Sequence, residues 1–246
     1  MSTVTFRMWR GDREQGGFRD YPTEVSEGMV VLDAVHRVQA EQATDLAVRW
    51  NCKAGKCGSC SAEINGKPRL MCMTRLDSLD LTDAVTVEPM KAFPLIRDLV
   101  TDVSWNFRVK KTVKPFKPRP PDAPDGTWRM QQREIDRVQE FRKCIECYLC
   151  QDVCHILRDH HLHDDFIGPR FLLYNAALEM HPLDEEDRLG DLNNRDGVGY
   201  CNITRCCTTV CPEHITITEN AIIPLKERVV DRFYDPLTRL LRVFRT

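Results

Sequence analysis

Two patterns of apolar positions divide the chain. Apolar and polar residues alternate over residues 4–9, which predicts a strand, and a second segment at residues 18–25 completes a hairpin. Residues 29–43 carry apolar side chains at helical spacing. Asn65-Gly66 stands between two short apolar segments, which is a strong hairpin signal. The first half is therefore expected to combine strands with a helix.

The second half follows a helical pattern instead. Apolar residues recur every three positions over residues 128–142, and Pro169 stands where a helix would begin. Between the halves, five of the eleven residues of Lys114–Pro124 are proline, which excludes a continuous helix or a central strand. We therefore predict a first domain over residues 1–113, a linker over residues 114–126 and a second domain over residues 127–246.

Cysteine is the most informative part of the composition, because the chain has 12 cysteines among its 246 residues. A chain of this length buries a sizeable core and does not need disulfides to fold. The first residues lack the apolar run of a secretory signal, so a cytosolic setting is expected, where thiols hold metals more often than they pair. A formal net charge of −2 offers no basic field for nucleic acid, and no apolar run is long enough to cross a membrane.

The cysteines of the first half have the spacing of a plant-type 2Fe-2S site, C-x4-C-x2-C followed by a more distant fourth. Gly55 and Gly58 would let this loop approach a cluster closely. A zinc site is the alternative, although four-thiolate zinc sites usually show two short C-x2-C pairs. The predicted ligands are Cys52, Cys57, Cys60 and Cys72.

The cysteines of the second half form two runs with one template, that of bacterial two-cluster ferredoxins, in which the fourth cysteine of each run serves the other cluster. In the second run Thr204 occupies the middle ligand position. One centre has four thiolates and is predicted to be 4Fe-4S, with the ligands Cys144, Cys147, Cys150 and Cys211. The other has three, which predicts a 3Fe-4S centre with the ligands Cys154, Cys201 and Cys207.

Cys206 leaves an alternative open at this third centre. The hydroxyl of Thr204 is a poor ligand for iron, and Cys206 lies only two positions away. In a distorted loop its thiol would complete a second four-iron centre. A buried free thiol that binds no iron is the commoner state of an unassigned cysteine, and this is the favoured interpretation.

Together these motifs resemble a known family over nearly the whole chain. The segments CKAGKCGSC, MCMT, CIECYLCQDVC, FIGPRFLLYNAAL and CCTTVCP are similar to those of the iron–sulfur subunit of succinate dehydrogenase and fumarate reductase. The resemblance implies an α+β fold, with a β-grasp 2Fe-2S ferredoxin-like domain followed by an all-α ferredoxin-like domain that carries the other two clusters. It also implies that Thr204 stands where the family has a residue that does not bind iron.

The resemblance further implies an electron-transfer subunit with no catalytic residues of its own. Electrons would pass from the FAD of a partner flavoprotein through 2Fe-2S, 4Fe-4S and 3Fe-4S clusters to a membrane anchor and quinone, expected to be menaquinone. The subunit would lie at the cytoplasmic face of the bacterial inner membrane and would serve succinate oxidation. The alternatives are a subunit of fumarate reductase or of another flavoprotein, and a zinc-binding module without redox function.

Three positions depart from the family pattern. His155 follows the fourth cysteine of its run where proline is common, Asp159 replaces a quinone-pocket tryptophan, and Asn202 replaces a histidine beside the last cluster. These differences put the usual quinone pocket in question. They indicate an unusual membrane anchor, with haem or a further metal centre as a candidate cofactor.

Two further patterns in the sequence give weaker indications of function. Residues 155–163 contain four histidines, which would suit a metal-binding or proton-handling surface, but a polar loop is the favoured interpretation. From Asp235-Pro236 onward, apolar and basic residues fall on opposite faces of a predicted helix. Such a helix would either lie on a membrane or an anchor subunit, or pack on its own domain, and the sequence favours neither.

Overall fold

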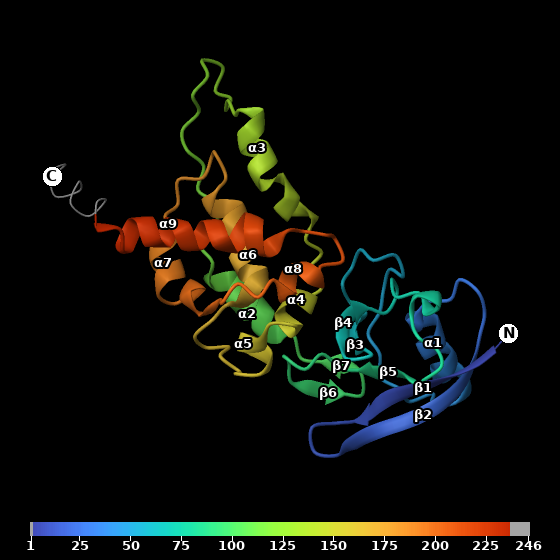
Figure 1. Cartoon of the computed structure of the whole chain (residues 1–246). Helices are drawn as coiled ribbons and strands as arrows, with labels where there is room; N and C mark the ends of the chain where they lie inside the picture. The colour runs from blue at the N-terminus through green and yellow to red at the C-terminus, as the bar shows by residue number, and fades with distance from the viewer. Residues whose placement is uncertain (1, 237–246) are drawn as a thin grey trace.

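The computed structural model of the protein describes residues 2–236. The strands are β1 (Ser2–Gly11), β2 (Gly16–Val25), β3 (Ser61–Ile64), β4 (Lys67–Leu70), β5 (Val85–Glu88), β6 (Leu95–Arg97) and β7 (Val100–Thr101). The helices are α1 (Val31–Glu41), α2 (Ser104–Thr112), α3 (Gln132–Gln139), α4 (Leu149–Asp152), α5 (His155–Arg158), α6 (Gly168–Glu179), α7 (Leu189–Asn193), α8 (Cys206–Thr209) and α9 (Ile223–Phe233). Figure 1 shows a sheet lobe at the N-terminal end and a helical lobe beside it.

The main sheet of the first lobe has the order β2-β1-β5-β3-β4. β1 and β5 are parallel, and the other neighbouring strands are antiparallel. α1 packs on this sheet because its apolar face matches it, with Leu32, Val35 and Val38 buried in the same core as Phe6 and Met8. A helix packed across a mixed sheet with a hairpin at each edge is the β-grasp arrangement. The predicted fold of the first half is therefore confirmed.

The turn that joins β3 to β4 shows why the sequence signal at this point was reliable. Asn65 and Gly66 have positive φ values of 48° and 70°, the conformation that a tight two-residue hairpin turn requires. Asparagine tolerates this region better than other residues with a side chain, and glycine adopts it without strain. The turn pairs Ile64 with Lys67 and sets the register of the whole hairpin.

The second lobe consists of helices, as predicted, and most of them are short. The apolar pattern over residues 128–142 corresponds to α3 and a following 3-10 turn at Glu140–Lys143, and Pro169 lies in the first turn of α6. None of the described helices is long and apolar enough to cross a bilayer. The amphipathic helix predicted from Asp235-Pro236 onward falls, after these two residues, outside the part of the chain that the structure describes.

The two lobes share their hydrophobic cores. Cys147 and Leu149, from the second half of the sequence, are buried in the core of the sheet lobe. Conversely, the core of the helical lobe takes in side chains from before the proline-rich segment, and Figure 1 shows α2 lying among the helices of that lobe. These side chains are Met90, Ala92, Phe93 and Val109. Each lobe therefore needs the other to complete its packing.

The proline-rich segment is fixed to the helical lobe by a buried arginine. The guanidinium of Arg188 donates to the backbone carbonyls of Lys114 and Pro115, at 3.0 and 2.7 Å. It also forms an ion pair of 2.9 Å with Asp184, and both side chains are only 1% exposed. Prolines cannot supply backbone N–H groups, so Arg188 adds side-chain donors to the backbone hydrogen bonds that Arg119 and Glu185 donate across the same contact.

A second ion-pair network joins the lobes. Glu63 on β3 is fully buried and pairs with Arg158 of α5 at 2.7 Å and with Lys91 at 2.9 Å. We expect Arg158→Ala to destabilise the chain by about 2 kcal/mol, because it leaves a buried carboxylate with one partner instead of two. The apparent Tm of the iron-loaded protein would measure this. Arg7→Ala, which removes an exposed pair with Asp20, should leave Tm nearly unchanged, and equal Tm values for the two variants would contradict the assignment.

Candidate metal centres

Four thiols of the sheet lobe converge at one end of the sheet. The loop that follows Trp50 supplies three of them, and the segment after β4 supplies the fourth. The Cys52 thiol lies within hydrogen-bonding reach of the Cys57 thiol, and the Cys60 thiol within reach of the Cys72 thiol. The residues predicted for the 2Fe-2S site, Cys52, Cys57, Cys60 and Cys72, are therefore brought together.

The electrostatics of this loop suit sulfur ligands. The backbone N–H groups of Ala54 and Lys56 donate to the Cys52 sulfur at 3.3 and 3.4 Å and lower the pKa of this thiol to about 6. Burial has the opposite effect on Cys60 and raises its pKa to about 12. Hydrogen bonds to sulfur stabilise negative charge, which is what a cluster held by thiolates requires.

A second group of thiols lines a cavity in the helical lobe. Cys144 and Cys147 come from the loop that enters α4, Cys150 comes from α4 itself, and Cys211 comes from the segment after α8. Burial raises the pKa of Cys147 to about 12 and raises the pKa of Cys150 well above the usual value of a thiol. The side chain of Arg170 lines the same cavity. The four ligands predicted for the 4Fe-4S centre thus face one space.

The remaining three predicted ligands line a separate cavity. Cys154 comes from the end of the first run, and Cys201 and Cys207 come from the second. Thr204 and Cys206 also line this cavity, and the Thr204 hydroxyl donates to the Cys206 sulfur at 3.3 Å. Each run therefore sends its last cysteine to the cavity of the other run, as the two-cluster template requires.

The backbone conformation shows which residues of the first cysteine run correspond to Thr204 and Cys206 of the second run. In the first run, left-handed residues precede and follow Cys147, with φ values of 56° at Glu146 and 63° at Tyr148. In the second run the left-handed residues are Ile203 and Arg205, at 59° and 63°. The two loops have the same shape, so Thr204 occupies the place of Cys147 and Cys206 the place of Leu149, a core residue and not a ligand of its own loop.

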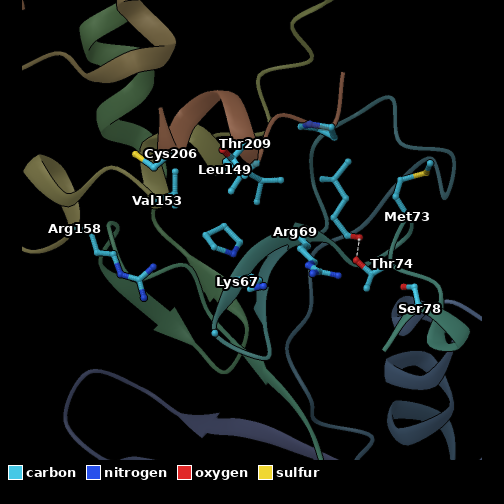
Figure 2. Close-up of a pocket in the computed structure, with 15 residues that line it drawn as sticks. Lys67, Arg69, Met73, Thr74, Ser78, Leu149, Val153, Arg158, Cys206 and Thr209 are labelled. Carbon is cyan, nitrogen blue, oxygen red and sulfur yellow. Dashed lines mark hydrogen bonds between the residues drawn. The ribbon is translucent and has the colours of Figure 1, made fainter. Parts of the chain in front are cut away.

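Cys206 also borders a pocket between the lobes. Figure 2 shows Leu149, Val153, Cys206 and Thr209 of the helical lobe on one side and Lys67, Arg69 and Met73 of the sheet lobe on the other. The pocket has a volume of about 600 Å³. Its position accounts for the partial exposure of Cys206, which lies between this pocket and the third cavity.

Comparison with known proteins agrees with this geometry. Residues 5–108 match the family model of the 2Fe-2S iron–sulfur cluster binding domain, and residues 140–215 match that of the 4Fe-4S dicluster domain. The fumarate reductase iron–sulfur subunit of Mycobacterium tuberculosis is 34% identical over 202 residues, covering 80% of each chain. The chain belongs to the iron–sulfur subunits of succinate dehydrogenases and fumarate reductases. It is an electron-transfer subunit with 2Fe-2S and 4Fe-4S domains.

Two further relatives support the assignment of this iron–sulfur subunit. The succinate dehydrogenase iron–sulfur subunit of Coxiella burnetii is 32% identical over 219 residues, covering 86% of this chain and 91% of its own. A chain in the solved structure of the Mycobacterium smegmatis Sdh1 complex in the apo form is 59% identical, with a TM-score of 0.91. That match covers 95% of this chain and 98% of the other, so the predicted two-domain α+β fold is confirmed.

The histidines of residues 155–163 lie in different environments. His155 begins α5 and lines the third cavity, whereas His163 contacts the carbonyl of Ala92 at 2.9 Å and packs edge-on against Trp105. The segment therefore starts as a helix where a polar loop was expected. Within residues 2–236 there is no group of three or more His, Cys, Asp or Glu side chains that could hold a single metal ion.

Sequence reasoning missed several polar groups around the cavities. The Thr218 hydroxyl lies 3.4 Å from the Cys207 sulfur, and Lys226 donates to the Cys201 carbonyl at 2.8 Å. Arg170 is buried and pairs with Glu146 at 2.7 Å. Burial opposes the charge of Arg170, but nearby thiols and Glu146 outweigh it and raise its pKa. Arg170 lies in the segment FIGPRFLLYNAAL, which resembles the family, and this was the only sequence signal that Arg170 belongs to the site.

The cavities fit iron–sulfur clusters in their donor chemistry. Thiolates are the ligands that such clusters require, and all twelve cysteines are free thiols. Burial raises the pKa of Cys154 to about 12 and of Cys207 to about 11, so without metal these thiols remain protonated at neutral pH. Loading with iron must therefore release protons and stabilise the fold around the sulfur atoms.

Proposed function

We propose that this chain is the iron–sulfur subunit of a succinate dehydrogenase, relaying electrons from an FAD-bearing flavoprotein to a membrane anchor and its quinone. One observation carries the proposal: the three thiol groups follow one another through the molecule. The loop of Cys57 and Cys60 touches Cys147, Cys150 lies in the short helix α4, and Cys154 lies two residues beyond the end of that helix. A row of thiolate sites of this kind holds one-electron centres in sequence.

The proposed roles of the chain's own residues follow from their positions. The thiolates bind iron, backbone N–H groups stabilise the charge on sulfur, and the shared apolar cores exclude water from the second and third sites. The 2Fe-2S ligands are Cys52, Cys57, Cys60 and Cys72. The 4Fe-4S ligands are Cys144, Cys147, Cys150 and Cys211, and the 3Fe-4S ligands are Cys154, Cys201 and Cys207.

The membrane side of the proposal concerns the third site. His155 and Asn202 line its cavity, and Asp159 stands one residue beyond α5. These residues differ from the family pattern, so we place quinone reduction, with menaquinone as the candidate acceptor, within the anchor. An anchor that holds haem or another metal centre would suit this arrangement. In this proposal the assembled subunit lies at the cytoplasmic face of the inner membrane.

The direction of the reaction separates two candidates. The 59% identity to a chain of the Sdh1 complex favours succinate oxidation, whereas relatives at 34 and 32% identity favour fumarate reductase as the second candidate. The test is low-temperature EPR on the complex purified from membranes, as isolated and after succinate or dithionite, with iron and sulfide counted. We expect succinate to reduce the 2Fe-2S centre and a FAD-bearing subunit to copurify. A colourless, iron-free complex would overturn the proposal.

Cys206→Ala tests the assignment of the third site. Because Cys206 occupies the place of Leu149 in the repeated loop, we expect iron content and the EPR signal of the oxidised 3Fe-4S centre to remain unchanged. Cys207→Ala is the matched comparison and should lose that signal. If Cys206→Ala lost iron or changed the signal, Cys206 would be a ligand and the third centre would need reassignment.

A further inference from the structure

The loop around the 2Fe-2S ligands meets the loop around the 4Fe-4S ligands at Gly58. Gly58 has a φ of 68°, and its Cα faces the main chain of Cys147. A Cβ added to Gly58 would lie 2.7 Å from the Cα, 2.9 Å from the nitrogen and 3.0 Å from the Cβ of Cys147. Such separations are too short for any side chain, so only glycine permits this contact.

A serine on β3 ties the two loops together at the same point. The Ser61 hydroxyl lies 2.8 Å from the Cys147 carbonyl and 3.0 Å from the Gly58 carbonyl. Its single proton is shared between these two acceptors, which belong to different lobes. Ser61 is 6% exposed, so the hydrogen bond is shielded from water, and its loss would leave a buried carbonyl unpaired.

An ion pair lies on each side of this contact. Lys56, two residues before Gly58, pairs with Glu213 of the helical lobe at 3.1 Å. Glu63, two residues after Ser61, is fully buried and pairs with Arg158. The buried pair of Glu63 and Arg158 therefore fixes the strand that carries Ser61, whereas the Lys56 side chain is 69% exposed and its pair adds little.

We propose that Gly58 and Ser61 are positioning residues for electron transfer: they hold the loop of Cys57 and Cys60 in direct contact with the main chain of Cys147. The inference rests on the proposed function, in which Cys57 and Cys147 bind iron in neighbouring centres. Covalent bonds lead from the Cys57 sulfur to Gly58, and one van der Waals contact leads from Gly58 to Cys147. The transfer moves one electron and no proton, and the flavoprotein supplies the electron.

Gly58→Ala tests the contact, with Gly66→Ala as its matched control. Gly66 has a φ of 70°, so alanine brings similar backbone strain at both sites, but nothing lies within 4 Å of a Cβ at Gly66. The readout is microwave power saturation of the 2Fe-2S EPR signal in the dithionite-reduced complex. A reduced neighbouring centre speeds its relaxation, and this effect falls steeply with distance. We expect Gly58→Ala to saturate at lower power than wild type and Gly66→Ala to match wild type.

Ser61→Ala provides a second test in case the Gly58 variant does not fold. We expect it also to saturate at lower power, while the midpoint potential of the 2Fe-2S centre stays as in wild type. Ser78→Ala is the control, because that hydroxyl donates to a carbonyl within its own exposed turn. If both Gly58→Ala and Ser61→Ala load iron and saturate as wild type does, the positioning role is overturned.

The outcomes distinguish this inference from the proposed function. Wild-type complex without separate 2Fe-2S and 4Fe-4S signals would overturn the function, and the inference with it. Wild-type complex with both signals, together with variants of unchanged relaxation, would overturn the inference alone. Lower saturation power in both variants and in neither control would support it.

Discussion

Thr204→Cys is expected to convert the proposed 3Fe-4S centre to a 4Fe-4S centre. Thr204 lines the same cavity as Cys154, Cys201 and Cys207, and its backbone position matches that of Cys147, the proposed ligand in the first run. A thiolate there supplies the soft ligand that a fourth iron requires. Iron per chain should rise by one atom, and the EPR signal of the oxidised 3Fe-4S centre should disappear.

Thr209→Cys is the control for this conversion. Thr209 is the last residue of α8, and it borders the pocket between the lobes and not the third cavity. A cysteine there adds a thiol without adding a ligand, so iron content and the EPR signal should stay as in wild type. If Thr204→Cys kept the original iron count and signal, Thr204 would not occupy a ligand position of the third centre.

Arg188→Ala is expected to lower the stability of the helical lobe by about 3–5 kcal/mol. The substitution leaves the buried carboxylate of Asp184 without its counter-ion and frees the carbonyls of Lys114 and Pro115. For a chain of this size, the apparent Tm should fall by about 10 °C. Differential scanning calorimetry of the iron-loaded protein would measure the change.

The comparison variant for Arg188→Ala is Arg75→Ala. Arg75 pairs with Asp77 on the surface, where both side chains are more than half exposed, and such pairs contribute little to stability. We expect its Tm to match that of wild type. Equal Tm values for the two variants would show that the attachment of the proline-rich segment does not stabilise the lobe.

Local signals in the sequence predicted much of the fold and the membership of each thiol group. Asn65-Gly66 identified its turn because the required backbone conformation restricts the residues at two adjacent positions. The cysteine spacings predicted the three groups because only a few residues separate ligands within a run, and a cluster forces such short loops into one shape. That shape recurs in the left-handed residues on either side of Cys147 and Thr204.

Contacts between distant parts of the chain could not be predicted in this way. No spacing rule joins Ser61 to Cys147, or Arg188 to Lys114, because these contacts depend on how whole lobes pack. The helix α5 was missed for a related reason. A four-residue helix contains too few apolar positions to show a period.

The shared cores have a consequence for synthesis of the chain. Proteins fold from the N-terminus as they leave the ribosome. The sheet lobe comes from the first part of the chain, yet its core is complete only when Cys147 and Leu149 have emerged and packed. Until then, an apolar surface beside the 2Fe-2S ligands remains open to solvent. Docking of the helical lobe is what covers this surface.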